Sequence, residues 1–210
     1  KYSPQKVDSK KYSCSTFMLH LGLDKIYDLP HHTVFFAEDY KGNIQDIFEN
    51  KVLSKNLSFY VRNASVTDST LAPDGHSSVY VLVPVPNKKA VIDWNKEKIN
   101  MRNRVIKALE EHAEMIDIED HIREEIVFTP QTWENMNIQY GATFNLAHSF
   151  MQMLYFRPRN KFEELDNCYL FGRGTHPGRG LPTIYESGRI AANLISKQHG
   201  IPFKSKNQKI

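Results

Sequence analysis

The sequence predicts an α+β fold, with a mainly antiparallel sheet, one covering helix, and a glycine-dense loop that leads into a second long helix. Three observations support this prediction. Runs rich in β-branched and aromatic residues recur between residues 13 and 85, as is typical of strands. Apolar residues then recur at helical spacing between residues 93 and 113. Finally, four glycines fall between residues 172 and 180, just before another stretch of helical periodicity.

The strands are expected to form one sheet. In residues 13–22, Phe17, Leu19 and Leu21 alternate along one face, and His20 falls on the other. The further β-rich runs are residues 33–37, 57–61, 78–85 and 126–128. Prolines close the last two runs, because proline cannot donate a hydrogen bond to a sheet ladder.

The helices and turns follow from apolar spacing and from breaker residues. Ile44 and Phe48 indicate a short helix, and residues 71–75 have the composition of a turn. A longer helix is expected from residue 93 or 95 to about residue 113. Pro182 suits the first position of the last helix, where the missing N–H of proline costs nothing, and Gly200 suits its end.

The composition is that of a globular piece with one core, because the chain has 210 residues and is 40% hydrophobic. No apolar run approaches the roughly 20 residues that a membrane-spanning helix needs. Cys14 and Cys168 are too few for a disulfide framework and are interpreted as buried thiols in a reducing cytoplasm. The net charge of +3 arises partly at the chain ends, from Lys1, Lys6, Lys10, Lys11, Lys204, Lys206 and Lys209. Solvated tails are the main interpretation, and attraction to an anionic lipid surface is the alternative.

The loop at residues 172–180 is expected to bring bare backbone against a large ligand. Gly172, Gly174, Gly178 and Gly180 have no β-carbon, so a ligand can approach the chain closely there. The helix that follows presents free N–H groups and a partial positive charge, which favour a phosphate or an anionic ring edge. A simple turn is the alternative, because glycine and proline concentrate in turns.

Three short motifs lie in and after this loop: GTHPG at residues 174–178, GLP at 180–182 and SGR at 187–189. They resemble the C-terminal flavin-binding signature of bacterial-type carotenoid desaturases, the phytoene and diapophytoene desaturases related to flavin amine oxidases. The resemblance extends to GATF at residues 141–144, FRP at 156–158, an expected strand at 167–171 and YSC at 12–14. Arg173 and Arg179 depart from it, because the family is expected to carry small residues there.

The resemblance implies FAD as the cofactor. It assigns the cofactor contacts to the loop and the helix start, at Gly172, Gly174, Thr175, His176, Gly178, Gly180, Leu181 and Pro182. Apolar residues before the loop would line a channel for a polyene, at Phe144, Met153, Tyr155 and Phe156. Ordinary core is the alternative for these four residues. Neither a catalytic acid or base nor a metal ligand is assigned, because the flavin carries the hydride chemistry.

The resemblance also implies a domain organisation. Enzymes of this family are expected to be about twice this long and to begin with a strand and a GxGxxG loop that holds the FAD pyrophosphate. No GxGxxG occurs in this sequence, so the chain is interpreted as a C-terminal part. Residues 1–139 are then part of the substrate-binding domain, and residues 140–210 return into the FAD-binding domain as strand, loop and helix. The chain alone is expected to bind FAD poorly and to be inactive.

The expected function is FAD-dependent desaturation of a long linear isoprenoid such as phytoene or diapophytoene, in carotenoid biosynthesis. One alternative is another flavin enzyme of carotenoids or retinoids, such as an isomerase, a terminal oxidase or a saturase. The other is a non-catalytic module that binds lipid or protein. The expected partners are the polyene, a membrane surface and the part of the chain with the GxGxxG half, without nucleic acid. The expected location is the cytoplasm, with peripheral attachment to a membrane.

Other groups of polar residues are assigned no chemistry. His31 and His32 are adjacent, so their side chains are expected to point to different sides and to form no metal site. The carboxylates between residues 117 and 125 are interpreted as a solvated connection. Ser187 lacks the surroundings of a nucleophile elbow. His176 is interpreted as a residue that orders the loop and does not shuttle protons.

Overall fold

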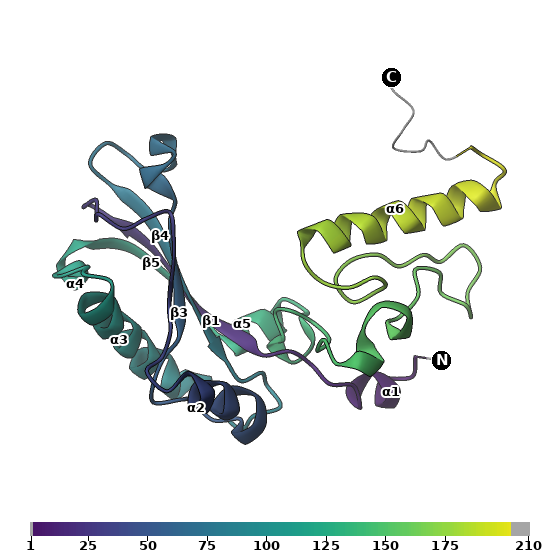
Figure 1. The fold of residues 1–210 in the computed structure, drawn as a ribbon, viewed down its shortest axis with the longest axis horizontal. Helices are drawn as coiled ribbons and strands as arrows, with labels where there is room; N and C mark the ends of the chain where they lie inside the picture. Colours follow the sequence, from purple (N-terminus) through teal and green to yellow (C-terminus); the bar gives the residue numbers. More distant parts are fainter. Residues whose placement is uncertain (1, 203–210) are drawn as a thin grey trace. The chain divides into compact units, whose positions relative to one another are not determined.

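The computed structural model describes residues 2–202 and divides into two compact units (Figure 1). The first, here called the sheet unit, is Cys14–Thr143. The second, the loop unit, combines Lys1–Ser13 with Phe144–Ile210. The boundary predicted from the sequence lies instead after residue 139 and assigns residues 1–13 to the same domain as the sheet. The ligand of each domain stays a prediction. The terminal lysines Lys1, Lys204, Lys206 and Lys209 lie outside the described residues.

The sheet unit contains one five-stranded antiparallel sheet with strand order β2-β3-β4-β1-β5, which confirms the predicted sheet. Its strands are β1 (Ser15–Leu23), β2 (His32–Phe35), β3 (Phe59–Asn63), β4 (Ser77–Val85) and β5 (Ile122–Phe128). β4 ends at Val85, directly before Pro86, in agreement with the predicted run of residues 78–85. Pro84 fits within the strand because β3 pairs with β4 only as far as Leu82, so its missing N–H interrupts no β3–β4 ladder.

Six α-helices are described: α1 (Pro4–Asp8), α2 (Tyr40–Gln45), α3 (Trp94–His112), α4 (Ile118–His121), α5 (Pro130–Asn135) and α6 (Leu181–Gln198). The three predicted helices correspond to α2, α3 and α6. Asp93 caps α3, because its side chain accepts a hydrogen bond from the Asn95 N–H. α2 continues as one π-helical turn at Asp46–Asn50. Within residues 2–202, no helix combines the length and apolarity needed to cross a bilayer.

The core lies between the sheet and α3, which covers one face of the sheet (Figure 1). Phe17 and Leu19 of β1 and Leu109 of α3 are fully buried in it. The ring of Trp94 stacks on that of Phe17, with the ring centroids 6.0 Å apart. Burying one such side chain contributes about 1.5–3 kcal/mol to stability. The alternation predicted for β1 therefore identifies the core face correctly.

The opposite face of the sheet carries aromatic and polar side chains. His20 lies on it, as predicted, with its ring 5.6 Å from Tyr80 and 5.4 Å from Phe128. Burial lowers the pKa of His20. The ring of Trp133 stacks on Phe128 at 4.7 Å, and its indole N–H donates to the Thr16 carbonyl at 2.9 Å. α5 is thus attached to this face of the sheet.

The histidine pair departs from its prediction. The rings of His31 and His32 stack with centroids 4.2 Å apart, so the two side chains do not point to different sides. Strand alternation does not apply to them, because β2 begins only at His32. Hydrogen bonds hold both rings, from His31 Nδ1 to Thr67 Oγ1 at 2.6 Å and from His32 Nδ1 to the Tyr60 hydroxyl at 2.5 Å.

The carboxylates of residues 117–125 are mostly exposed, as predicted, but they belong to α4, its N-terminal flank and β5, and Asp117, Glu119 and Glu125 form ion pairs. The Arg102 guanidinium lies 2.6 Å from Glu119 and 2.7 Å from Glu125. Asp117 accepts a hydrogen bond from Lys25 at 2.7 Å. Guanidinium–carboxylate bonds of this kind fix orientation as well as distance. The cluster therefore joins α3 to the end of the sheet.

The strand predicted at residues 167–171 is not formed. In that segment of the described chain only Tyr169 makes a β-bridge, with Lys161. Two backbone bonds hold it, from Phe162 N–H to the Cys168 carbonyl and from Leu170 N–H to the Asn160 carbonyl. A strand needs a longer ladder with a neighbour, and residues 160–162 supply only this short pairing. Cys168 and Cys14 are free thiols that are half-buried, not fully buried as predicted.

Leu109→Ala should lower the free energy of unfolding by about 2–5 kcal/mol, because it removes a fully buried side chain from the core. Chemical denaturation followed by circular dichroism would measure the loss. Ile99→Ala, at a site 66% exposed on the same helix, is the matched control and should change stability by less than about 0.5 kcal/mol. Equal losses in the two variants would contradict the assignment of the Leu109 face to the core.

Candidate functional site

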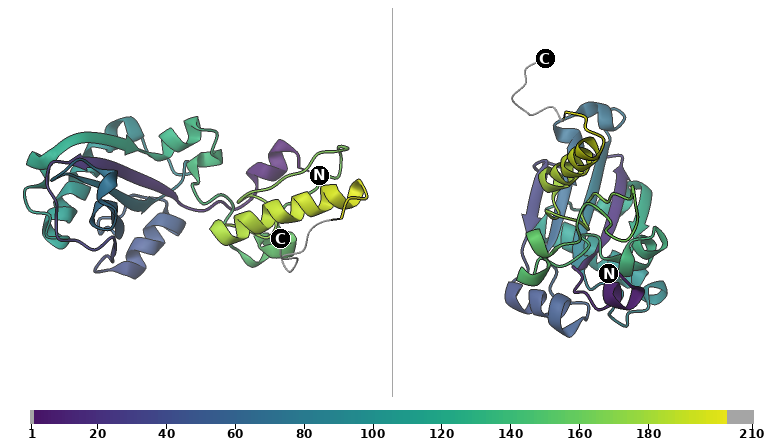
Figure 2. Two further views of the ribbon diagram at one scale, coloured as in Figure 1. Left: turned by 90° about the horizontal axis from the view of Figure 1, so that it is seen from above. Right: turned by 90° about the vertical axis from the view of Figure 1, so that its right-hand side faces the viewer.

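The glycine-dense loop and the helix after it belong to the loop unit, where α6 runs along the loop segments (Figure 2). Residues 172–180 contain neither strand nor helix, so their buried backbone groups need partners outside regular structure. Gly180 is the N-cap residue of α6, with a φ of 98°. Leu181 is the first helical residue, which places Pro182 one position later than predicted.

Three buried polar side chains join the loop to α6, and we call Asn160, Thr175 and Ser187 the Asn160 cluster. The Asn160 amide Nδ2 donates to Ser187 Oγ at 2.9 Å and lies 3.1 Å from the carbonyl oxygens of Leu170 and His176. Thr175 Oγ1 is 2.8 Å from Ser187 Oγ. All three members of the cluster are buried. Hydrogen bonds are stronger in such surroundings and unpaired polar groups cost more, so the cluster fixes the loop against the helix.

Arg157 makes a second set of bonds to the loop. Its guanidinium donates to the carbonyl of Arg173 at 2.8 Å and to that of Gln152 at 2.9 Å. The side chain is only 2% exposed, and its Nε has no hydrogen-bond partner among the described residues. Burial lowers the pKa of Arg157, and the neighbouring charge of Arg179 lowers it further. A buried cation with an unsatisfied donor therefore lies beside the loop.

Arg179 adds a further cation at the end of the loop. Its guanidinium lies 5.1 Å from the ring centroid of Phe144. Burial, together with the charges of Arg179 and Arg157, lowers the pKa of His148. A lowered pKa keeps this imidazole neutral near pH 7. The His148 imidazole therefore adds no fixed positive charge to those of Arg157 and Arg179.

His176 holds the middle of the loop. Its ring Nδ1 lies 2.9 Å from the Leu154 carbonyl oxygen, and its backbone N–H donates to the Pro158 carbonyl at 2.8 Å. Both contacts tie the loop to the segment before it. These contacts agree with the ordering role expected of His176.

The predicted cofactor contacts fall into two groups. Thr175 belongs to the buried Asn160 cluster, and β-carbons at Gly174 and Gly178 would lie 3.3 Å from Asn145 and 3.7 Å from His148. The second group opens to free space, at Gly172, Gly180, Leu181 and Pro182. The first group thus shapes the loop, and the second is accessible to a ligand.

The start of α6 can receive an anionic group. No side chain among the described residues caps its first turn by a hydrogen bond. A β-carbon at Gly180 would meet nothing nearer than Thr183 Oγ1 at 3.8 Å, and one at Gly172 would meet no atom within 4 Å. Free N–H groups and a partial positive charge remain at a helix start of this kind. The geometry therefore suits an anion or a polarised ring edge.

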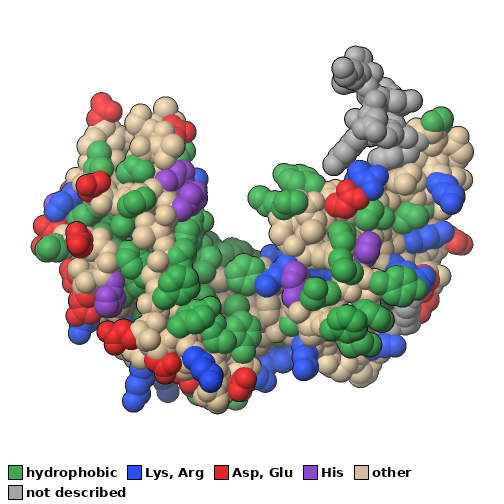
Figure 3. Space-filling model, in the orientation of Figure 1, with side chains coloured by type: hydrophobic (Ala, Val, Ile, Leu, Met, Phe, Trp, Pro, Cys, Tyr) green, Lys and Arg blue, Asp and Glu red, His purple; other side chains and the backbone are tan. Residues whose placement is uncertain are grey.

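The four residues predicted to line a polyene channel lie before the loop and are accessible. Tyr155 is 73% exposed, Phe144 and Phe156 are also exposed, and Met153 is half-buried. Within the residues that the structure describes, these four side chains are therefore not part of a buried core. Hydrophobic side chains gather over this segment in Figure 3. The exposed group, here called the aromatic surface, consists of Phe150, Met151, Leu154, Tyr155 and Phe156.

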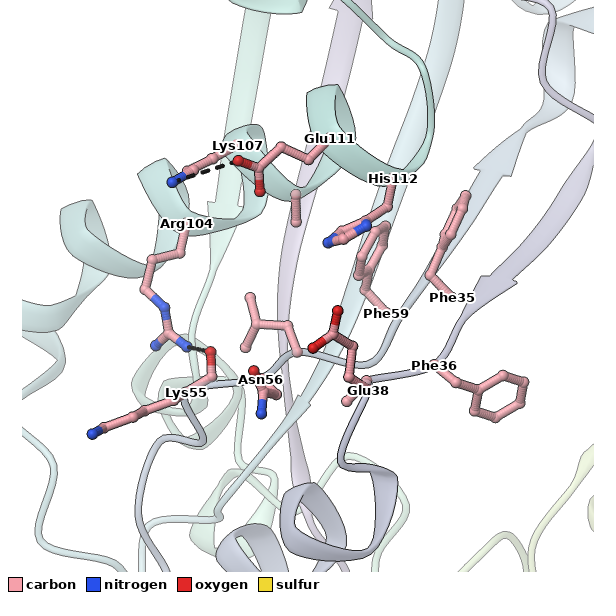
Figure 4. Close-up of a pocket in the computed structure, with 13 residues that line it drawn as sticks. Phe35, Phe36, Glu38, Lys55, Asn56, Phe59, Arg104, Lys107, Glu111 and His112 are labelled. Carbon is pink, nitrogen blue, oxygen red and sulfur yellow. Dashed lines mark hydrogen bonds and ion pairs between the residues drawn. The ribbon is translucent and has the colours of Figure 1, made fainter.

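A groove of about 590 Å³ lies in the sheet unit, between α3, β2 and residues 55–57 (Figure 4). It has aromatic walls, and three of its charged side chains, those of Arg104, Lys107 and Glu111, have partners of their own. Arg104 donates to the carbonyls of Ser54 and Lys55, and Lys107 lies 3.5 Å from Glu111. Because these groups do not converge on one point, the groove lacks an arrangement typical of catalysis.

Sequence reasoning missed two residues that build the site, Asn160 and Arg157. The FRP triplet at residues 156–158 is a signal for Arg157, although it assigns no role to the guanidinium. Asn160 lies on no periodic element, and its partner Ser187 is 27 residues away, so the sequence carries no signal for their contact.

Comparison with curated proteins identifies close relatives, although no protein-family model matches the chain. The chain is 57% identical over 205 residues, 97% of its length, to a 4,4′-diapophytoene desaturase (4,4′-diapolycopene-forming) of Methylomonas sp.. It is 43% identical over 92% of its length to an all-trans-zeta-carotene desaturase of Myxococcus xanthus. It is 36% identical over 94% of its length to a 4,4′-diapophytoene desaturase (4,4′-diaponeurosporene-forming) of Staphylococcus aureus. The matches cover 40%, 37% and 40% of these three proteins, so the chain spans only part of their length.

Arg157→Lys should loosen residues 172–176, because a lysine ammonium lacks the planar fork that reaches the Gln152 and Arg173 carbonyls together. The free energy of local opening should fall by about 1–3 kcal/mol. Faster amide hydrogen exchange in that segment would report it. Arg159→Lys is the control, since Arg159 is exposed and pairs with Glu163 at 2.6 Å on the surface. Exchange that is equal in both variants would refute the role of the Arg157 guanidinium.

Proposed function

We propose, since this chain belongs to the carotenoid desaturase family, that the protein desaturates a long linear isoprenoid such as phytoene or diapophytoene in carotenoid biosynthesis. The observation that carries the proposal is the 57% identity to a diapophytoene desaturase over 97% of the chain. The relatives from Myxococcus xanthus and Staphylococcus aureus, each matched over more than nine-tenths of the chain, also carry desaturase names. They support the same class of reaction on the same class of substrate.

The two alternatives receive less support. An isomerase, terminal oxidase or saturase could use a similar loop and helix, but the three relatives above are named as desaturases. A non-catalytic module would need only an apolar surface that binds a partner. It would not need a loop whose backbone is accessible to a ligand. The accessible loop at Gly172 and Gly180 favours the enzyme.

We infer that FAD is the cofactor and that this chain contacts the anionic edge of its ring. Three features suit such a group: the open positions Gly172 and Gly180, the uncapped first turn of α6, and the unpaired Nε of Arg157. Backbone N–H groups at a helix start favour negative charge. The flavin would supply hydride acceptance. Gly172, Gly180, Leu181 and Pro182 would hold its edge, and no side chain of this chain is assigned as acid or base.

The isoprenoid would lie against the aromatic surface beside the loop. The bond between Leu154 and His176 connects this surface directly to the loop, at 2.9 Å. Apolar walls suit a hydrocarbon chain, because contact with them removes apolar area from water. The proposed lining residues are Tyr155 and Phe156 of this surface, together with Phe144 and Met153, which precede the loop as well. Their role would be to orient the chain and to exclude water from the reacting carbon.

A membrane surface is the proposed partner, with peripheral attachment on the cytoplasmic side. A long isoprenoid dissolves in bilayers, so an enzyme that acts on it must draw it from lipid. The exposed side chains of Phe150 and Met151 suit contact with apolar lipid, and the exposed Lys6 and Lys11 suit anionic head groups. Such an electrostatic attraction would weaken as salt screens it.

Full-length protein supplied with FAD, an oxygen or quinone acceptor and liposomes of phytoene or diapophytoene should form polyenes that absorb at longer wavelength. Absorbance and chromatography of the extracted lipid would measure the products. Raising ionic strength from about 0.1 M to 1 M shortens the Debye length from about 10 Å to 3 Å and should lower the rate. The desaturase assignment is wrong if flavin-loaded protein leaves both isoprenoids unchanged but oxidises a small amine or another carotenoid.

Gly180→Val should reduce flavin retention while the far-ultraviolet circular dichroism stays nearly intact. A valine at φ 98° is strained by about 1–3 kcal/mol and fills the space through which the ring edge would approach. Flavin absorbance per purified protein would measure retention. Gly75→Val is the matched control, because Gly75 also has positive φ and open space but lies in the sheet unit. A fully yellow Gly180→Val protein would exclude the loop from the cofactor site.

A further inference from the structure

We propose that Asn160 is the positioning residue of the flavin loop, and that its amide sets the loop geometry on which flavin affinity and reduction potential depend. The inference rests on the proposed function for the identity of the ligand. It rests on the structure alone for the geometry of the loop. Asn160 lies outside the glycine loop and outside α6, yet it bonds to both.

The hydrogens of the Asn160 cluster can be assigned from its acceptors. Thr175 Oγ1 donates to the Gly172 carbonyl at 3.0 Å, so its own hydrogen is committed. Ser187 must then donate across the 2.8 Å contact to Thr175. Ser187 Oγ also accepts from the Gly172 N–H at 3.1 Å and from the Asn160 amide at 2.9 Å. A hydroxyl has one hydrogen and two lone pairs, so Ser187 is saturated.

The orientation of the Asn160 amide is fixed by its neighbours. The carbonyl oxygens of Leu170 and His176 can only accept, so the NH₂ group must face them and the amide cannot be flipped. Its two hydrogens are shared among three acceptors, namely these two carbonyl oxygens and Ser187 Oγ. Asn160 is therefore the donor that closes the cluster, and no rearrangement of Ser187 or Thr175 can replace it.

The consequence for the loop is direct. Gly172 is bonded to the cluster by both its N–H and its carbonyl, and His176 is bonded through its carbonyl. Ser187 belongs to α6, whose first turn lies next to Gly180. Moving the loop relative to the helix start therefore requires breaking buried hydrogen bonds. A ligand that contacts both the loop and the start of α6 would bind more weakly if the two moved apart, because a binding site must hold its groups within narrow limits of geometry.

The test compares full-length wild-type protein with Asn160→Asp, which keeps the shape of the side chain but removes the amide donors. Asn193→Asp makes the same chemical change at an exposed site on α6 and serves as the control. Three quantities are measured: amide hydrogen exchange of residues 172–176 without flavin, the dissociation constant of FAD, and the midpoint potential of the flavin at saturating FAD. Ser187→Ala repeats all three in case Asn160→Asp does not fold.

Asn160→Asp should speed exchange and raise the FAD dissociation constant by about tenfold or more, because a buried acceptor now faces two carbonyls. The midpoint potential should become more negative, since a displaced loop stabilises reduced flavin less; a potential of bound flavin equal to that of wild type would overturn the part of the inference that concerns the potential. Exchange and affinity within twofold of wild type, in Asn160→Asp or in Ser187→Ala, would overturn the inference. Failure of wild-type protein to bind FAD would overturn the proposed function, while the exchange comparison would still decide the role of Asn160.

Discussion

A partly buried loop without regular secondary structure must obtain hydrogen-bond partners for its buried backbone groups from outside the loop, and this constraint governs the loop unit. Residues 157–160 supply several of the hydrogen-bond partners of the loop backbone. Arg157 and Asn160 donate to its carbonyls, and the Pro158 carbonyl accepts from it. Unpaired, each of these backbone groups would cost about 1–3 kcal/mol. The glycines at 172 and 180 supply positive φ angles to the loop, and their α-carbons remain open to a ligand because side chains from outside the loop hold its backbone.

The periodic spacing of apolar residues predicted strands and helices correctly where an element buries a single face. It located β1 and α3, because Phe17 and Leu19, and likewise Met101 and Leu109, repeat at the spacing of their elements. The strand expected at residues 167–171 did not form, because that apolar run has only a single bridge among the described residues with which to build a ladder. The ion pairs of Glu119 and Glu125 could not be read from the sequence either, since their partner Arg102 is distant in sequence.

The residues of the candidate site likewise divide into those that the sequence could predict and those that it could not. Its glycines and Pro182 could be proposed from local composition, because the demand for open backbone is local, whereas Thr175 was implied only by the family resemblance. Asn160 and Arg157 could not be predicted, because their roles depend on carbonyls and hydroxyls brought close by the fold. Hydrogen bonds between residues that are distant in the chain produce no regular spacing of residues that could be recognised in the sequence. The exposure of Tyr155 was likewise beyond prediction, since composition alone cannot distinguish an apolar surface from a core.

Both tryptophans of the sequence, Trp94 and Trp133, lie in the sheet unit, one stacked on Phe17 and the other on Phe128. Phe17 belongs to the core, whereas Phe128 lies on the opposite face of the sheet. Intrinsic tryptophan emission is therefore an optical signal of this unit alone, and the loop unit contributes tyrosine but no indole. Unfolding of the sheet unit can consequently be followed by tryptophan emission, without any added label.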